Sequence, residues 1–179
     1  MSSTQAMSMS YEQMVDGCRR HDAKAQRALY DELAPMAMGV CMRYCTDRDE
    51  AQDLLQDGMV RVFEKIGSLK EPQKLRSWVY SIMVNCCVQH LRQARHERVS
   101  DELDTVADEA DLTPFTMRDI VEALHQIDNR QRLVFNLCAI EGRSSDDVAS
   151  EMGISAGNVR IMLYRARATM RAYLEKKLK

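Results

Sequence analysis

The chain has 179 residues and a formal net charge of −2, so its overall charge does not favour nucleic acid and any basic surface must be local. This length allows one domain of ordinary size or two small ones. Only 7 glycines and 3 prolines occur, and helix-favouring residues are common, so we expect an all-α fold. No apolar run is long enough to cross a bilayer.

The cysteines and the N-terminus indicate a reducing compartment. No two cysteines form a CxxC pair, and residues 1–9, which we expect to be a flexible tail, lack the features of a secretory signal. We therefore predict a cytoplasmic protein with free, buried thiols. The six cysteines are Cys18, Cys41, Cys45, Cys86, Cys87 and Cys138.

Two pairs of residues have the spacing of metal ligands on one helix face. Cys41 and Cys45 are four residues apart, as are Cys86 and His90. Both pairs lie within apolar stripes, where cysteine packs as a small hydrophobic residue. We therefore predict no metal site and no cofactor.

The first half of the chain has the apolar periodicity of helices. One helical segment is predicted over Tyr11–Tyr30 and another over Asp31–Tyr44, with Pro35 near a helix start. An amphipathic helix is predicted over Asp49–Ile66. By pattern alone its polar side is a solvent-exposed face. That side includes Asp53, Gln56 and Asp57.

A longer helix is predicted over Lys74–Val99, in which aromatic residues are interleaved with arginines. This combination is typical of proteins that hold unstacked single strands, because rings stack on bases and guanidinium groups contact phosphates. The alternative is that Trp78 is a core residue and the arginines are merely solvated. The aromatic residues are Trp78 and Tyr80, and the arginines are Arg76, Arg92, Arg95 and Arg98.

The composition then changes abruptly. Residues 99–116 include six acids and no lysine or arginine, which is typical of a linker between domains. We therefore predict two small helical domains, over residues 10–98 and 117–176, joined by an acidic linker over 99–116.

The segment Ser144–Arg171 has the pattern of a helix-turn-helix. Ser144 can cap the first helix, Gly153 suits the positive φ of the turn, and Ser155 can cap the second helix. In the second helix the residues at a helical repeat are apolar and are expected to face inward. They are Val159, Leu163, Ala166 and Met170.

The second helix is also basic, since the chain from Ala156 to Lys179 has seven lysines and arginines and one acid, Glu175. Such a helix suits phosphates, and its N-terminal end suits base edges in the major groove. The alternative is a helical hairpin with a solvated basic face. The predicted DNA-binding residues are Ser155, Asn158, Arg160, Ile161, Tyr164, Arg165 and Arg167.

Two ordered sets of motifs run along the chain. The C-terminal set comprises Leu124, Ile127, Arg132, Val134, Phe135, Leu137, Glu141-Gly142, Ser144, Val148-Ala149, Gly153-Ile154-Ser155, Val159 and Arg165-Ala166-Arg167. The N-terminal set comprises Ala51, Asp53-Leu54, Gln56-Asp57, Phe63, Arg76-Ser77-Trp78, Ile82, Asn85 and Leu91-Arg92. Together they resemble a bacterial sigma factor of the extracytoplasmic-function class, over residues 11–174. The first set resembles region 4, which reads the −35 promoter element, and the second resembles region 2.

The resemblance implies that the protein directs transcription initiation by binding core RNA polymerase and promoter DNA, without being an enzyme or having catalytic residues. An anti-sigma factor is a further implied partner. The implied −10 DNA-binding and melting residues are Arg76, Trp78, Tyr80, Asn85, Arg92 and Arg95, with Asn85 reading an extruded base. The residues implied to dock on the clamp helices of the β′ subunit are Asp53, Gln56 and Asp57.

Some positions depart from the family pattern. Gln89-His90 stands where an acid is common, Gly157-Asn158 replaces a common Gly-Thr, and Ile161-Met162 replaces a frequent Ser-Arg. The last change removes an expected phosphate contact. The departures leave the fold prediction intact and the promoter sequence open.

Three other functions fit parts of the sequence. A repressor or activator with a helical sensor domain would use the helix-turn-helix on duplex operators without polymerase. A pure adaptor would leave the two basic segments without a purpose. A thiol- or metal-dependent enzyme would use Cys86, Cys87, His90 and His96, but no catalytic motif or nucleotide-binding glycine loop supports it.

Overall fold

A computed structural model describes residues 9–93 and 115–177, and every regular element in these ranges is a helix, which confirms the predicted all-α fold. The chain divides into two compact units. The N-terminal unit comprises Met1–Cys41 and Arg48–Cys87, and the C-terminal unit comprises Met42–Asp47 and Val88–Lys179. The predicted tail 1–9 and linker 99–116 lie almost entirely outside the described residues.

The first helix begins at a reciprocal cap. Ser10 Oγ accepts a hydrogen bond from Gln13 N at 3.2 Å, and Ser10 N donates to Gln13 Oε1 at 3.0 Å, forming a capping box before α1 (Tyr11–Arg19). This exchange satisfies two backbone N–H donors at the start of the helix. It sets the start of the N-terminal unit.

The single helix predicted over Tyr11–Tyr30 is interrupted by a turn. His21 has a φ of 58°, and Asp22 Oδ1 accepts hydrogen bonds from the N–H groups of Lys24 and Ala25, at 2.7 and 3.1 Å. Asp22 therefore caps a new helix, α2 (Ala23–Tyr44), and local side-chain bonding overrides the helical periodicity.

The prediction that Pro35 lies near a helix start is wrong, because Pro35 lies inside α2. A proline there removes one backbone hydrogen bond and costs about 3 kcal/mol. Pro35 is itself exposed, and apolar side chains on both sides of it along α2 are fully buried. Burying each of them contributes about 1.5–3 kcal/mol, so tertiary packing outweighs the local penalty. They include Leu29, Leu33, Val40 and Cys41.

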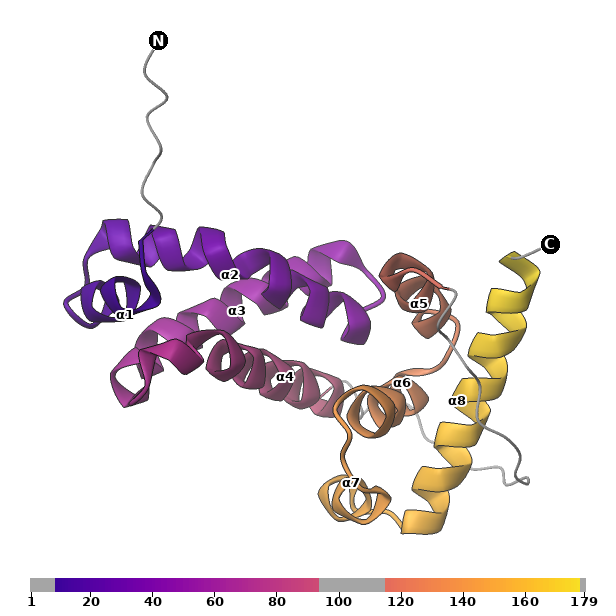
Figure 1. Ribbon diagram of the computed structural model, residues 1–179. Helices are drawn as coiled ribbons and strands as arrows, with labels where there is room; N and C mark the ends of the chain where they lie inside the picture. Colours follow the sequence, from indigo (N-terminus) through magenta and orange to yellow (C-terminus); the bar gives the residue numbers. More distant parts are fainter. Residues whose placement is uncertain (1–8, 94–114, 178–179) are drawn as a thin grey trace. The chain divides into compact units, whose positions relative to one another are not determined.

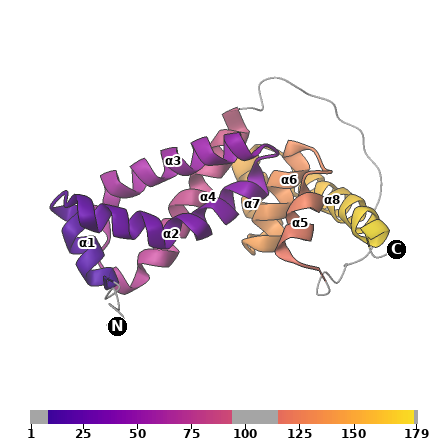
Figure 2. The same cartoon turned by 90° about the horizontal axis from the view of Figure 1, so that it is seen from above.

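Helix α2 runs alongside α3 (Arg48–Lys65) and α4 (Leu75–Gln93), most of which belong to the N-terminal unit, and α1 lies near the start of α2 (Figures 1 and 2). The predicted apolar stripe of α3 faces inward, since Leu54, Met59 and Val62 are buried. A Cβ placed on Gly58 of α3 would lie 2.4 Å from the sulfur of Met83 in α4, so these two helices are in close contact. The short elements η1 (Ile66–Ser68) and η2 (Pro72–Lys74) lie between α3 and α4, and the last residues of α4, 88–93, belong to the C-terminal unit.

The C-terminal unit is built around one long helix, α8, which Figure 1 shows in yellow and against which α5, α6 and α7 pack. Its core combines residues from α5, the turn after it, α6 and α8: Ala123, Leu124, Ile127, Phe135, Ala166, Met170 and Leu174. The helical elements in order are α5 (Met117–Leu124), α6 (Asn129–Phe135), the π-helical segment η4 (Asn136–Ile140), α7 (Ser145–Met152) and α8 (Ala156–Lys177).

A buried arginine fixes the turn between α5 and α6. The side chain of Arg132 is only 2% exposed, and its guanidinium donates to the carbonyl oxygens of Leu124 and Ile127, both at 2.9 Å. These carbonyls follow the end of α5, where a positive charge is favoured. Asp128 caps α6 by accepting hydrogen bonds from two backbone N–H groups.

The contact between α1 and α2 requires a glycine at position 17. A Cβ on Gly17 would lie 2.3 Å from Ala25 Cβ, a distance that neither helix can relieve by rotating a side chain. We expect Gly17→Ala to lower the free energy of unfolding of the N-terminal unit by about 1–3 kcal/mol, as overpacking does. The control is Gly39→Ala at an exposed position of α2. A Cβ there meets nothing within 4 Å and should stabilise the helix by about 1 kcal/mol. Urea unfolding followed by circular dichroism measures both, and equal stability of Gly17→Ala and wild type would contradict the expectation.

Candidate nucleic-acid interface

The helix-turn-helix predicted from the sequence is present in the C-terminal unit. Ser144 Oγ accepts from Asp147 N at 3.0 Å and caps α7. Gly153 has a φ of 66° and a ψ of 39°, the left-handed conformation expected for the turn. Ser155 Oγ then accepts from Asn158 N at 3.2 Å, which starts α8. All three predicted local features are therefore confirmed.

The inward face of α8 also matches the prediction. Val159, Ala166 and Met170 are buried, and Leu163 is partly buried against the core. Val148 and Met152 of α7 are buried too, so both helices of the motif contribute to the apolar interior. This packing fixes the direction in which the opposite face of α8 points.

The predicted DNA-binding residues lie on the rest of the α8 surface. Arg160 and Ser155 are exposed, whereas the others are partly buried. Because each residue turns a helix by about 100°, Ile161 and Arg165 lie on the side opposite Val159. Arg160 lies on the flank of that side. The partly buried members are Asn158, Ile161, Tyr164, Arg165 and Arg167.

An ion-pair cluster joins the far end of α8 to α5. The Lys177 ammonium contacts Asp119 at 2.6 Å and also Glu122, and the Tyr173 hydroxyl donates to Glu122 at 3.3 Å. Hydrogen bonds from Lys177 and then from Thr116 lower the pKa of Asp119 to about 2. The same lysine lowers the pKa of Glu122, and the two carboxylates raise the pKa of Lys177. The cluster adds to the apolar contacts that hold α8 in place.

In the N-terminal unit, the predicted −10 residues are spread around α4. Arg76 and Asn85 are exposed, and Trp78 and Tyr80 are partly buried. Trp78 is thus not a fully buried core residue. Asn85 follows Trp78 by seven residues and lies on the same face, whereas Tyr80 lies about 200° away from Trp78. The helix therefore brings Trp78 and Asn85 together and separates them from Tyr80.

The other two predicted −10 arginines are Arg92 and Arg95. Arg92 belongs to the C-terminal unit, where its guanidinium forms an ion pair with the Glu151 carboxylate and donates to the Glu151 carbonyl oxygen at 3.2 Å. Glu151 also pairs with Arg143, so one carboxylate engages two arginines. Arg95 lies outside the described residues.

The polar side of α3 is an exposed acidic face. Asp53, Gln56 and Asp57 are all exposed, as the pattern predicted. Sequence reasoning missed Val60, which lies one turn further along the same face and is 55% exposed. The signal was available, because an aliphatic residue three or four positions after two polar ones falls on the polar side of a helix.

The cysteines are free, and all but Cys138, which is only partly buried, are buried. Burial raises the pKa of the Cys18, Cys86 and Cys138 thiols, although nearby arginines oppose this at the last two. A hydrogen bond from Cys87 lowers the pKa of Cys41. Thiols with raised pKa values are poor nucleophiles, which does not favour the thiol-enzyme alternative. Of its proposed residues, His96 lies outside the described residues.

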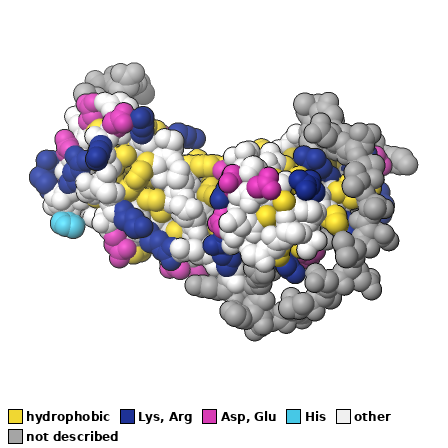
Figure 3. Space-filling model, turned by 90° about the horizontal axis from the view of Figure 1, so that it is seen from below, with side chains coloured by type: hydrophobic (Ala, Val, Ile, Leu, Met, Phe, Trp, Pro, Cys, Tyr) yellow, Lys and Arg dark blue, Asp and Glu magenta, His cyan; other side chains and the backbone are white. Residues whose placement is uncertain are grey.

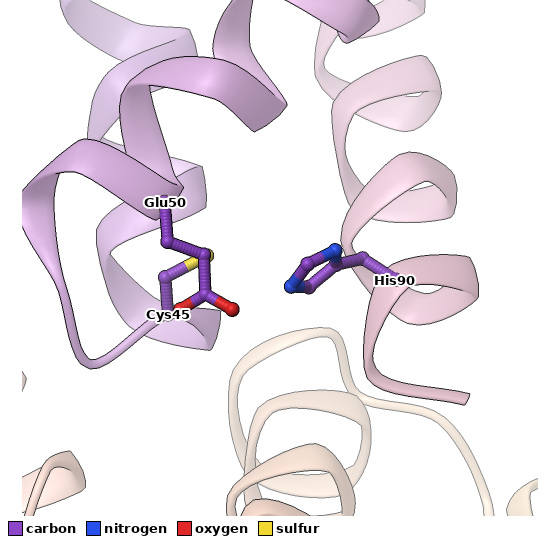
Figure 4. A group of neighbouring side chains, drawn as sticks. All are labelled: Cys45, Glu50 and His90. Atoms are coloured by element: carbon purple, nitrogen blue, oxygen red, sulfur yellow. The ribbon is translucent and has the colours of Figure 1, made fainter. Parts of the chain in front are cut away.

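Figure 4 shows three side chains of types that can bind metals: Cys45 after the end of α2, Glu50 in the first turn of α3, and His90 near the end of α4. Cys45 and His90 belong to the C-terminal unit and Glu50 to the N-terminal unit. They therefore do not form a ligand set within either unit. The sequence had not singled out Cys45 and Glu50 as a pair.

Basic side chains form local groups on the surface, as expected for a chain with a net charge of −2. On the face drawn in Figure 3, lysine and arginine side chains occur in several separate groups, with acidic groups between them. Across the residues that the structure describes, no helix combines the length and the apolar character that crossing a membrane requires.

The chain combines a capped helix-turn-helix, whose second helix is basic, with a separate helical unit that has an aromatic and polar face. This combination defines a DNA-binding protein of transcription. Residues 29–97 match the family Sigma-70 region 2, and residues 117–170 match the family Sigma-70, region 4. The chain belongs to the sigma-70 family of sigma factors, in its extracytoplasmic-function class.

Relatives of similar length match along most of the chain. RNA polymerase sigma-H factor of Pseudomonas aeruginosa is 28% identical over 174 residues, covering 87% of this chain and 89% of that protein. ECF RNA polymerase sigma factor SigL of Mycobacterium tuberculosis is 28% identical over 170 residues, covering 90% and 95%. Among solved structures, sigma factor RpoE in complex with the anti-sigma factor NepR from Bartonella quintana is 23% identical with a TM-score of 0.48, covering 79% of this chain and 91% of that chain.

The ion pair at the end of α8 gives a pH-dependent prediction. Because the pKa of Asp119 is depressed from its ordinary value of about 3.9, the pair contributes to stability above about pH 4 and that contribution is lost as the pH falls towards 2. In Lys177→Met the pKa of Asp119 should rise, while the Thr116 hydrogen bonds keep it below 3.9. NMR titration of the Asp119 carboxyl carbon measures this shift.

The matched control for this titration is Lys176→Met, which removes the neighbouring exposed lysine. That variant should leave the pKa of Asp119 near 2. An equal pKa in both variants would show that Lys177 is not the cause of the depression.

Proposed function

We propose that this chain is a promoter-specificity subunit of RNA polymerase: it binds the core enzyme in the cytoplasm, its C-terminal unit reads the −35 element, and its N-terminal unit reads and melts the −10 element. The observation that carries the proposal is the occurrence of both sigma-70 regions in one chain, with a helix-turn-helix in the second. An anti-sigma factor is the further partner that the family resemblance implies.

In this proposal the N-terminal half of α8 enters the major groove of the −35 duplex. Arg160 is exposed near the start of the helix, where an arginine can form a bidentate contact with guanine. Arg165 and Arg167 lie further along, where contacts with phosphates add affinity without sequence information. The buried residues on the opposite side of α8 fix the direction in which these side chains point.

The −10 DNA is assigned to the face of α4 that has Trp78 and Asn85. An exposed amide can form two hydrogen bonds with the edge of an extruded base, and an indole surface can support a neighbouring base. Arg76 supplies a positive charge close to the start of the helix. Tyr80 lies on another side of α4, so its contact is with a different part of the DNA.

The exposed face of α3 is assigned to the core enzyme. Asp53 and Asp57 supply negative charge, Gln56 supplies hydrogen-bonding groups, and Val60 supplies an apolar anchor at the same face. This composition fits a partner surface with basic residues around an apolar contact, as the clamp helices of the β′ subunit would provide. Acidic residues here also favour a protein partner over DNA.

Run-off transcription tests the proposal directly. The purified chain, added to core RNA polymerase with a library of promoter fragments, should yield transcripts that neither component yields alone. A repressor or activator of the helix-turn-helix type would bind duplex DNA without conferring initiation, so this assay separates the two functions.

Charge reversal on α3 tests the assignment of the core-binding face. The double variant Asp53→Lys/Asp57→Lys should weaken binding to core enzyme about ten-fold or more, because like charges replace complementary ones. DNA binding by the helix-turn-helix should not change. The control is Asp16→Lys/Asp31→Lys, which makes the same charge change at exposed sites of α1 and α2. Fluorescence titration of labelled chain with core enzyme measures both, and equal affinities would remove α3 from the interface.

Substitution of Asn85 tests the −10 assignment. Asn85→Ala should lower open-complex formation about ten-fold, the equivalent of about 1.4 kcal/mol for lost hydrogen bonds to one base, and should spare closed-complex binding. Gln52→Ala, which removes an exposed amide from α3, is the control. Permanganate reactivity of the −10 thymines measures melting. Wild-type reactivity in Asn85→Ala would count against the assignment.

A further inference from the structure

Ile161 is an aliphatic residue on the face of α8 that points away from the core. It lies about 200° around the helix from the buried Val159. It does not belong to the apolar core cluster of the C-terminal unit, whereas Leu163, two residues later, packs against that cluster. Its side chain is only partly buried. Part of the Ile161 side chain therefore remains available for contact.

The surroundings of Ile161 are those of a DNA-reading surface. Arg160 and Arg165 lie to either side of it on the helix, and Asn158 is one turn earlier. Ile161 is in the second turn of α8, the part of a recognition helix that approaches base edges. The arginines supply charge for phosphates or guanine, so the remaining question is which feature of the DNA an aliphatic side chain can recognise.

Only one apolar group projects from the base pairs into the major groove, the C5-methyl group of thymine. The other base edges there present hydrogen-bond donors or acceptors, which would lose water without gaining a partner against an aliphatic side chain. We infer that Ile161 recognises the methyl group of a thymine in the −35 element. This inference rests on the proposed function, and it assigns a base preference to one residue of the reading helix.

The contact can be tested by removing the methyl group from the DNA. A −35 duplex is first selected from a randomised library by the full chain bound to core polymerase. Each thymine of both strands is then replaced in turn by deoxyuridine, which lacks only the C5-methyl group. At one position the replacement should weaken wild-type binding about four-fold, the effect of burying one methyl group.

Variants of the protein assign the effect to Ile161. In Ile161→Ala the thymine and deoxyuridine duplexes should bind with equal affinity at that position. Met162→Ala is the matched control, because Met162 is an adjacent, partly buried apolar residue that lies about 100° further around the helix. It should keep the four-fold difference. The wild-type measurement does not depend on the folding of either variant.

The outcomes separate this contact from the proposed function. If no thymine position shows a penalty with the wild-type chain, or if Ile161→Ala keeps the penalty, the contact is overturned while promoter-dependent transcription stands. If the chain and core polymerase do not initiate from any promoter, the proposed function fails and this inference fails with it.

Discussion

The apolar contact between α8 and the helices before it is the constraint on which the DNA-reading surface depends. Phe135 of α6 and Leu124 of α5 meet Ala166, Met170 and Leu174 on one side of α8. Because a helix is rigid over this length, burying that side fixes the direction of the opposite one. The left-handed turn at Gly153 then sets the angle between α7 and α8. The arginines and Ile161 can act together only because this interior is fixed.

Polar contacts of the C-terminal unit, like its apolar contacts, hold its helices in fixed positions. Arg132 is buried, yet its charge is met by carbonyl oxygens at the end of α5, so the cost of desolvation is offset by hydrogen bonds. Lys177 joins the last turn of α8 to Asp119 and Glu122 of α5. One contact lies in the interior and the other at the surface, and both restrict how α5 can move against the rest of the unit.

Most local features could be predicted from the sequence, because they depend on residues three or four apart. The caps at Ser144 and Ser155 and the turn at Gly153 are of this kind. Predictions were less successful where a local preference met a competing contact. Pro35 was expected near a helix start, but buried neighbours on α2 keep it in the helix interior, and the Asp22 cap divides a segment whose periodicity looked continuous.

The sequence by itself determined the all-α class, the helix-turn-helix, its inward stripe and the exposed acidic face of α3, since each follows from short-range periodicity. Tertiary structure decided which candidate residues share a surface. It buried the guanidinium of Arg132 and paired Arg92 with Glu151. Such outcomes depend on where distant segments pack, and no pattern of neighbouring residues specifies the partner of a side chain fifty or more positions away.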